Sequence, residues 1–564
     1  MTKLKMDLVC QVAVVVNDLE EGIKTCRELF GFEEDSLTFS DSRDAYAEGR
    51  LKDVRYNGTE GEFHYLQHNF FMGGMDIEMF SPLPGYEDEV NPFTDFLKEN
   101  GINPYREDFV RTHTIKETLA LDEGAKVKIC GRIIFRRIMG KFGFAKIQDI
   151  DGMIQVSVGR NEIEESEYDF YKKLVDVGDF IGVEGELYRT QTGELTVRAH
   201  KVELLSKAMR PLPEKFHGLT DIEAKYRQRY LDIIMNEKSR EVFKARSKVE
   251  SLVRRYLEDN GFTEIETPVL QKNVSGAAAK PFFTKHNALD LECNLRIAKE
   301  TWLKMAMVAG FDRVFELGKD FRNEGMDPTH LQEFTQVEWY ASFWRFEDNI
   351  TFFQELVKKL LKEIIGTLEI NYQGNVINFG GEWERIDYVA RLREILGFDF
   401  MQETDLNEFK KKVVATKLFT SHDLEECKSI RTLIDYIYKR TIREKIVGPT
   451  ILYNYPAVLK TLARHSDQDY NIAEAFQVVV CGAEICNAFS ELVDPEIQRT
   501  VLEAQQVEKN QGDDETMDVD EDFLLAMEHG MPPMSGLGFG IDRFVMLIFD
   551  LPNIRDGVLF PIMK

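Results

Sequence analysis

The stretch Gly536-Leu537-Gly538-Phe539-Gly540-Ile541-Asp542-Arg543 decides the fold of the C-terminal part of this chain. Alternating glycines are typical of a strand that neighbouring groups approach closely, and the apolar run Phe544 to Phe549 predicts a helix directly after it. Arg543 then lies at a strand-to-helix junction, where a guanidinium can bind a terminal phosphate or stack on a purine. The stretch is neither a Walker loop nor a dinucleotide fingerprint, so on its own it also fits a tight turn that packs a helix.

A second motif lies upstream, at Phe321-Arg322-Asn323-Glu324-Gly325, followed by His330 and by a β-like run from Phe334 to Tyr340. An arginine fork can clamp phosphate oxygens bidentately, and an aromatic ring nearby can stack on a base. Taken alone, the string equally fits a surface hairpin whose Arg and Glu side chains pair with each other.

The third motif, Ala483-Glu484-Ile485-Cys486-Asn487-Ala488-Phe489-Ser490-Glu491, lies between the first two. Its acidic residues flank an Asn and a Phe, a combination that can hold a divalent cation and an ammonium group. Taken singly, they are ordinary charged positions.

The composition bounds the class of protein. With 564 residues, 43% apolar and 30% charged, the chain has enough apolar side chains for several folded domains. A net charge of −27 argues against a protein that coats nucleic acid non-specifically. No apolar run approaches the roughly 20 residues of a membrane crossing. The 7 cysteines are scattered, without the spacing of a zinc or redox site. We therefore expect a soluble cytoplasmic protein without a membrane partner.

Changes in pattern divide the chain into four parts. The first is a compact α+β unit, the second a connector rich in Pro and Gly, the third a set of short strands separated by glycine turns that predicts a small antiparallel barrel, and the last a mixture of β-rich runs and long amphipathic helices. Their boundaries are 1–88, 89–112, 113–208 and 209–564. Helices are predicted at Ser239–Asn260 and Phe346–Ile365. The run Lys126 to Lys146 is basic and contains no acidic residue, which fits either a solvated strand face or a local nucleic-acid footprint.

Taken in chain order, the segments Phe321 to Gly325, Ala483 to Glu491 and Gly536 to Arg543 resemble motif two, the intervening strand and motif three of class II aminoacyl-tRNA synthetases, specifically the lysyl-tRNA synthetases. Gly261 to Pro268 resembles motif one, and the resemblance extends from about Phe93 to Lys564. It implies an α+β multidomain fold, with an antiparallel catalytic sheet and helices preceded by an all-β OB barrel. The implied function is that of an ATP-dependent lysine–tRNA ligase, which forms lysyl-adenylate and transfers the lysyl group to tRNA(Lys). The resemblance also implies Mg²⁺ as cofactor and a homodimer.

The resemblance also implies roles for individual residues. Arg322 and Arg543 would be catalytic and would bind ATP with Glu324, His330 and Phe334. The lysine-binding residues would be Glu300, Glu338, Tyr340, Asn487, Phe489 and Glu491. Glu484 and Glu491 would hold Mg²⁺, and Arg132, Phe144, Gln148 and Glu194 would meet the anticodon. The acids and hydrogen-bond acceptors among the lysine-binding residues suit the side-chain ammonium of lysine, which must be paired once it has left water. The alternative for Glu300 and Glu338 is pairing with a neighbouring Lys or Arg.

Three segments depart from the family pattern. Ala475-Phe476-Gln477 stands where Arg-Phe-Glu is usual, and Lys460-Thr461-Leu462-Ala463-Arg464 replaces Ser-Pro-Leu-Ala-Lys. Thr329-His330-Leu331-Gln332 stands where Arg-His-Asn-Pro is common. Two alternative functions therefore remain: a lysine ligase acting on a translation elongation factor, and an inactive tRNA-binding regulatory protein.

The N-terminal unit does not resemble a synthetase. The segments Gln11 to Ile23, Leu29 to Phe32 and Met75 to Gly85 resemble one βαβββ module of the vicinal oxygen chelate superfamily, which includes the glyoxalases. The metal ligands of that family match Gln11 and Glu78. Because one module supplies only half a metal site, a docking or dimerisation module is the favoured interpretation.

Overall fold

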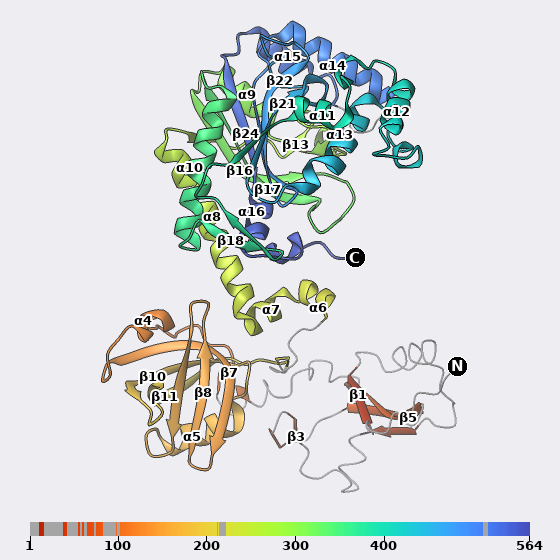
Figure 1. Ribbon diagram of the computed structural model, residues 1–564. Helices are drawn as coiled ribbons and strands as arrows, with labels where there is room; N and C mark the ends of the chain where they lie inside the picture. The colour runs from red at the N-terminus through yellow and green to blue at the C-terminus, as the bar shows by residue number, and fades with distance from the viewer. Residues whose placement is uncertain are drawn as a thin grey trace. The chain divides into compact units, whose positions relative to one another are not determined.

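A computed structural model describes the backbone of residues 11–15, 38–41, 55–56, 59–60, 65–72, 75–82, 97–98, 102–210, 212–213, 221–510 and 517–564 (Figure 1). The chain forms two compact units, Met1–Glu214 and Lys215–Lys564. The first contains a small N-terminal sheet and a barrel, and the second contains the large sheet that carries the candidate site.

The N-terminal sheet has four strands in the order β1 (Gln11–Val15), β6 (Met75–Pro82), β5 (Tyr65–Met72) and β2 (Thr38–Asp41). β1 runs parallel to β6, whereas β5 is antiparallel to both of its neighbours. A separate hairpin joins β3 (Arg55–Tyr56) and β4 (Thr59–Glu60). The helix that the sequence places in this unit lies outside the described residues.

The barrel is closed, in the strand order β10 (Phe180–Arg189), β11 (Leu195–Ser206), β9 (Met153–Gly159), β8 (Phe142–Gln148) and β7 (Lys126–Met139). α4 (Ile115–Leu119) precedes it, and α5 (Glu165–Leu174) joins β9 to β10. Alternate residues of the strands point inward, which is the expected period of a half-buried strand, and they form one apolar core. The sequence prediction of an all-β barrel before the large domain is confirmed.

The large sheet of the second unit has eight strands. Their order is β12 (Thr263–Glu264), β16 (Arg313–Phe321), β17 (Glu333–Ser342), β24 (Met534–Gly540), β23 (Ala483–Ser490), β22 (Ile472–Val480), β21 (Thr450–Pro456) and β20 (Glu384–Asp387). The six central strands are antiparallel, and only the two outer pairs are parallel.

The two faces of this sheet carry different layers because side chains alternate along each strand. On β17, Val337 and Trp339 enter a core shared with α8 (Glu237–Asp259), α10 (Phe346–Ile364) and α16 (Ile541–Ile548). Tyr340 belongs to the opposite core, which includes residues of α9 (Glu300–Val308) and α15 (Glu521–Glu528). The helices predicted from the sequence at Ser239–Asn260 and Phe346–Ile365 are confirmed as α8 and α10.

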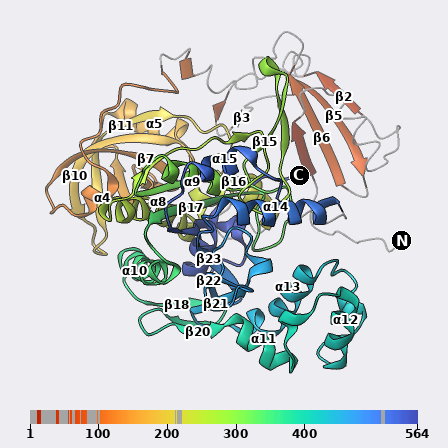
Figure 2. The ribbon, with the colours of Figure 1, turned by 90° about the horizontal axis from the view of Figure 1, so that it is seen from above.

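The remaining elements surround the sheet. The chain enters through α6 (Ile222–Arg227) and α7 (Arg229–Met235), and β13 (Leu270–Gln271), β15 (Leu291–Leu295) and β14 (Phe283–His286) form a three-stranded sheet. β18 (Glu369–Tyr372) pairs with β19 (Asn375–Asn378). α11 (Tyr388–Leu396), α12 (Leu406–Ala415) and α13 (Ile430–Thr441) gather beyond β20 and β21 (Figure 2), and α14 (Pro495–Asn510) contacts α15. No helix in the described part of the chain is long and apolar enough to cross a membrane.

Candidate active site

Three neighbouring strands form the floor of the site. The register places Gly538 of β24 between Glu338 of β17 and Asn487 of β23, and it places Gly536 between Tyr340 and Phe489. A Cβ on Gly536 would overlap the ring of Tyr340. The glycines therefore let the side chains of the two flanking strands lean over the middle strand, which explains the alternating pattern in the sequence.

Above this floor lies a cavity of about 340 Å³. The structure brings every residue of the large domain for which the sequence suggests a role in binding ATP, lysine or magnesium to the lining of this one cavity. These residues are Glu300, Arg322, Glu324, His330, Phe334, Glu338, Tyr340, Glu484, Asn487, Phe489, Glu491 and Arg543. They come from positions up to about half the chain apart, so the fold and not sequence proximity assembles them.

One end of the cavity is lined by buried acids. Glu338 is 5% exposed, and its Oε1 accepts a hydrogen bond of 2.7 Å from the hydroxyl of Tyr340. Its Oε2 has no hydrogen-bond partner among the described residues. Burial, and secondarily the nearby charge of Glu300, raises the pKa of Glu338 to about 7. This carboxyl is therefore poised to accept a cation that restores its charge.

An internal lysine lies among these acids. The Nζ atom of Lys304 on α9 is 2.6 Å from Oε1 of Glu300 and 2.5 Å from Oε2 of Glu491, and its side chain is fully buried. For Glu300, the alternative of pairing with a neighbouring Lys is thus what the structure shows. Lys304 was not predicted from the sequence, because no helix was predicted there; α9 sets it at i,i+4 from Glu300, a spacing that brings opposite charges together. Three carboxylates and one ammonium leave this end with a formal charge of −2 when all are ionised.

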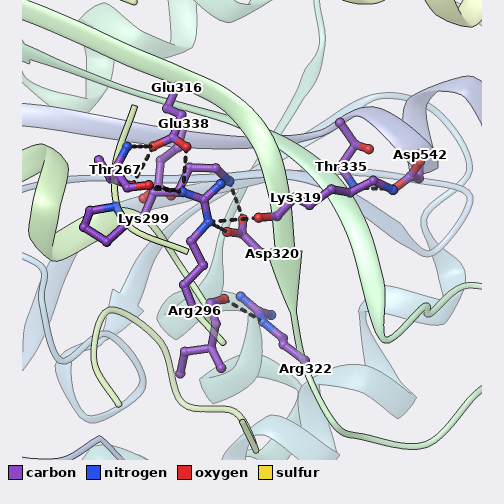
Figure 3. Close-up of polar contacts among 12 residues, drawn as sticks. Thr267, Arg296, Lys299, Glu316, Lys319, Asp320, Arg322, Thr335, Glu338 and Asp542 are labelled. Carbon is purple, nitrogen blue, oxygen red and sulfur yellow. Dashed lines mark hydrogen bonds and ion pairs between the residues drawn. The ribbon is translucent and has the colours of Figure 1, made fainter. Parts of the chain in front are cut away.

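A second network holds the strand that delivers Arg322 (Figure 3). Arg296 donates to Glu316 at 2.6 Å, and Lys299 pairs with Asp320 at 2.5 Å, all buried. Arg322 follows β16 directly, and its Nε donates to the carbonyl of Ile297 at 3.3 Å. These contacts tie the end of β16 to the segment before α9, so they orient the arginine before a ligand arrives.

The aromatic and basic residues for the nucleotide lie on the hairpin between β16 and β17 and at the start of α16. The guanidinium of Arg322 lies 5.1 Å from the centroid of the Phe334 ring. Arg543 donates to the carbonyl of Glu484 at 3.0 Å and contacts Nε2 of His330 at 2.8 Å. Since arginine only donates, Nε2 must accept, and Nδ1 carries the proton toward Asp327 at 2.7 Å. Burial and the charge of Arg543 lower the pKa of His330, in agreement with a neutral ring.

A second hollow of about 350 Å³ adjoins the first cavity. Both are lined by Arg322, Lys460, Glu484 and Arg543, which form their common border. Six basic side chains and three carboxylates line it, a formal excess of three positive charges. The basic residues are Arg322, Arg431, Lys439, Arg443, Lys460 and Arg543, and the acids are Glu324, Asp435 and Glu484. The first end of the cavity is thus acidic and the adjoining hollow basic.

The assignment of Glu484 and Glu491 as magnesium ligands stays a prediction. They lie at opposite ends of β23, seven residues apart, which corresponds to roughly 23 Å at about 3.3 Å per residue. Glu491 is also engaged with Lys304. The described residues contain no cluster of three or more His, Cys, Asp or Glu with metal-site geometry, and both glutamates line the cavity. Glu484 lies at the basic hollow, where it can be one ligand of an ion held mainly by phosphate oxygens.

The four residues predicted to meet the anticodon lie on the barrel with different degrees of exposure. Arg132 donates to the carbonyl of Gly178 at 2.8 Å and stacks on the ring of Phe180 at 4.3 Å, and Gln148 is 8% exposed. One Nη of the half-buried Arg132 is engaged and Gln148 is buried, and the roles of both side chains in base readout stay predictions. Phe144 and Glu194 remain accessible, and Glu194 pairs with Lys146 at 2.8 Å.

The sequence analysis missed other members of the exposed face. A register shift in β7 between Ile133 and Phe135 places Arg137 opposite Phe144 and Phe135 opposite Lys146. Phe135 is 43% exposed, and Arg137 is exposed. A bulge of one residue reverses which side chains face outward, and periodicity without the bulge selects the wrong ones.

Comparison with known proteins agrees with this architecture. Residues 221–564 match the family of tRNA synthetases class II (D, K and N), and residues 127–205 match the OB-fold nucleic acid binding domain. The lysine–tRNA ligase of Lactococcus lactis subsp. lactis is 44% identical over 481 residues, covering 83% of this chain and 96% of the relative. Those of Listeria monocytogenes and Bacillus cytotoxicus are 43% and 41% identical, each covering 83% of this chain and 95% of the relative. The matched length includes both the barrel and the large sheet.

Proposed function

Because the chain belongs to the class II tRNA synthetases, within the lysine–tRNA ligase family, we propose that its cavity activates L-lysine with ATP to lysyl-adenylate and transfers the lysyl group to tRNA(Lys). The observation that carries this proposal is the juxtaposition of an acidic, buried end and a basic, open end in one cavity. Few substrates other than a diamino acid and a nucleoside triphosphate match both ends at once.

The acidic end matches lysine in charge. Glu300, Glu338, Glu491 and Lys304 together carry −2, and the two ammonium groups of lysine carry +2. Oε2 of Glu338 and Oε1 of Glu491 are buried acceptors without hydrogen-bond partners among the described residues, so an ammonium would satisfy them. A substrate without the side-chain amine would leave them unsatisfied, at about 1–3 kcal/mol for each group.

The basic end matches the triphosphate. The lysine carboxylate is already the nucleophile, so activation needs alignment and charge neutralisation at the α-phosphate and no general base. Arg322, held at Ile297, would contact the carboxylate and α-phosphate, Phe334 would stack on adenine, and Arg543 would contact the γ-phosphate. The hydrogen bond from Arg543 to neutral His330 fixes its guanidinium for this contact.

Magnesium fits the site through a single protein carboxylate. Glu484 lines the basic hollow, and no hydrogen bond to its side chain is seen from the described residues. Mg²⁺ commonly uses one or two carboxylates and completes its shell with phosphate oxygens and water. Bound Mg²⁺ would neutralise triphosphate charge. Gln477, at the same hollow, is neutral and adds only an amide oxygen.

The OB barrel supports tRNA as the acceptor. Its exposed face combines Phe135, Phe144, Arg137 and Lys146, which provide stacking surfaces and positive charge for single-stranded bases and phosphates. A ligase acting on an elongation factor would have no use for this face. We therefore favour tRNA(Lys) over that alternative acceptor.

We further propose a homodimer and a cytoplasmic location. Motif one contains β12, which is an edge strand of the large sheet, and Leu270 of β13 and Phe283 of β14, in the three-stranded sheet that follows in the chain, are 51% and 75% exposed. An edge strand with exposed apolar neighbours fits an interface with a second copy. Analytical ultracentrifugation tests this assignment: a Leu270→Glu, Phe283→Glu double variant should sediment as a monomer, and an unchanged dimer would refute it.

For the N-terminal sheet, we propose the βαβββ module described from the sequence, used for docking or dimerisation. The strand order β1-β6-β5-β2 with β1 parallel to β6 supports it. In this register Gln11 pairs with Asp76 and Ala13 with Glu78, so the two candidate metal positions lie on adjacent strands, offset by two residues.

Lysine-dependent exchange between ATP and pyrophosphate, measured against all twenty amino acids, tests the proposed function. We expect exchange with lysine at least about 100-fold above any other amino acid, since buried unpaired groups give large discrimination. Aminoacylation of tRNA(Lys) should follow. Absence of exchange with lysine would favour the inactive regulatory alternative, and exchange without charging of tRNA would favour another acceptor.

A further inference from the structure

Lys460 lies at the border between the acidic and the basic parts of the site. It follows the short 3-10 turn η7 (Ala457–Leu459) and lines both hollows, together with Arg322, Glu484 and Arg543. Its position therefore coincides with the place where the amino acid and the triphosphate must meet. Nothing described so far gives this side chain a role.

The contacts of Lys460 leave its charge available to a ligand. Its Nζ donates to Oδ1 of Asn487 at 2.5 Å and lies 4.6 Å from the centroid of the Tyr455 ring. Within the described part of the chain, no carboxylate forms an ion pair with it. An ammonium has three N–H donors, and one acceptor accounts for only one of them. The remaining donors are therefore free to hold an anion in the cavity.

The surrounding charges explain how an ammonium is tolerated there. Glu484 of β23, Asp435 of α13 and Glu300 of α9 act on it from a distance and favour its charged form. Burial acts in the opposite direction and lowers the pKa of Lys460. A bound anion would therefore gain a strong, desolvated partner.

A neutral network fixes the position of the ammonium. The hydroxyl of Tyr455 donates to Oε1 of Gln477 at 2.7 Å, and Nε2 of Gln477 donates to the same Asn487 oxygen at 3.4 Å. Lys460 and Gln477 are both positions at which this sequence departs from the family pattern, from Ser and Glu respectively. Lys460 adds one cation and Gln477 removes one acid, whereas Ala475 removes the Arg of the pattern, so these three positions together carry one more positive charge than that pattern without any bound ion.

We propose that Lys460 is a further catalytic residue, whose ammonium binds the α-phosphate of ATP at the point where the lysine carboxylate attacks. The carboxylate oxygen forms a bond to the α-phosphorus, the bond from this phosphorus to the bridging oxygen of pyrophosphate breaks, and pyrophosphate leaves with the electron pair. Lys460 transfers no proton and acts through its charge, which the Asn487 contact holds in place. This inference rests on the proposed lysine activation.

The test measures lysine-dependent exchange in wild type, Lys460→Met, Lys460→Gln and Lys460→Arg. We expect kcat to fall about 100-fold in the Met and Gln variants, as for the loss of one preorganised charge at a transition state, while KM for lysine changes less than about threefold. Lys460→Arg keeps the charge and should stay within about tenfold of wild type. Inhibition by lysinol adenylate, which carries the phosphate anion, should weaken at least about tenfold in the Met and Gln variants.

Lys359→Met is the matched control. Lys359 also lies over a tyrosine ring, at 5.3 Å from the centroid of Tyr256, but it is on α10 and away from the cavity. Its exchange rate should equal that of wild type, and thermal unfolding should confirm that all variants are folded. A folded Lys460→Gln with kcat and lysinol adenylate inhibition within threefold of wild type would overturn the inference. If wild type itself shows no lysine-dependent exchange, the proposed function fails instead, so the two outcomes are distinguishable.

Discussion

The two ends of the cavity handle charge in opposite ways. At the lysine end the charges are buried and already partly paired, with Lys304 between Glu300 and Glu491 and with Glu338 hydrogen-bonded to Tyr340. At the phosphate end the basic side chains line an open hollow and exceed the acids. The buried, partly paired charges at the lysine end provide discrimination between amino acids, since an unmatched group there is costly, whereas the excess of cations at the phosphate end provides attraction for any polyphosphate.

Of all the substitutions considered, removal of the Arg322 side chain should have the largest effect on lysine-dependent exchange. In Arg322→Ala we expect lysine-dependent exchange to fall at least about 1000-fold, because carboxylate and α-phosphate lose their shared positive partner. Arg391→Ala is the control, since Arg391 is exposed on α11 and pairs with nearby Glu394. Circular dichroism should show both variants folded. Exchange in folded Arg322→Ala near the wild-type rate would contradict its assigned role.

The buried pairing at the lysine end makes a prediction about stability. Lys304→Met leaves Glu300 and Glu491 without their common partner, and we expect a loss of about 3–5 kcal/mol in the free energy of unfolding. Denaturant titration measures it.

Two controls accompany that measurement. Adding Glu491→Gln to Lys304→Met should recover part of the loss, because one uncompensated charge is removed. Lys411→Met breaks an exposed pair with Glu408 on α12 and should leave the unfolding free energy nearly unchanged. Equal losses in Lys304→Met and Lys411→Met would show that the buried triad is not a stabilising unit.

Specificity should be separable from nucleotide binding. In Glu338→Gln we expect KM for lysine to rise about 100-fold and KM for ATP to change less than about twofold, because the carboxyl lies at the acidic end only. Steady-state exchange kinetics provide both constants. Glu333→Gln, on the same strand but exposed, is the control. Equal changes in the two constants would break the distinction between the two ends.

The anticodon face should affect only the second half of the reaction. Phe144→Ala removes one exposed stacking ring, and we expect KM for tRNA in aminoacylation to rise about tenfold, in line with about 1–3 kcal/mol per stacked base. Exchange without tRNA should be unchanged. Arg132→Ala should have a smaller effect on KM for tRNA, because its guanidinium already binds Gly178 and Phe180. A larger effect of Arg132→Ala would restore the residue to the recognition surface.

The smallest expected effect concerns pH. The pKa of Glu338 is raised to about 7, so the free enzyme gains the ionised form that binds an ammonium as pH rises from 6 to 8. KM for lysine should therefore fall by up to about tenfold over this range. The dependence should be absent in Glu338→Gln. A KM for lysine that is constant between pH 6 and 8 in wild type would place the carboxyl in its charged form throughout.

The candidate site could be identified largely from the sequence, because its motifs combine residue type with fixed spacing. Arg322, Glu338, Tyr340 and Arg543 follow from strings at the ends of predicted strands, and all of them line one cavity. The role of Lys304 could not be predicted, because the position of a residue on a helix does not show which side chains of the sheet it will contact. The metal assignment of Glu491 comes from the resemblance and stays a prediction, because the sequence did not show that Lys304 pairs with this carboxylate.

The barrel shows the same limit on a smaller scale. Alternation predicts which residues of β7 point outward until Ile133, but the register shift before Phe135 changes the side of every later residue. A bulge depends on pairing with β8 and β10, which a single strand does not encode. Phe144 could be selected from its position on β8, whereas Arg137 could not.

The sequence by itself determined the fold class, the order of the barrel and the large sheet, and the residue types of the site. It could do so because hydrophobic periodicity and local motifs are properties of short segments.

Only the tertiary structure decided which charges neutralise one another. It showed that Lys304 lies between Glu300 and Glu491, and that Lys460 lies at the border between the two parts of the site. The physical reason is that electrostatic pairing and burial depend on distances between segments far apart in the chain, and those distances exist only once the sheet has formed.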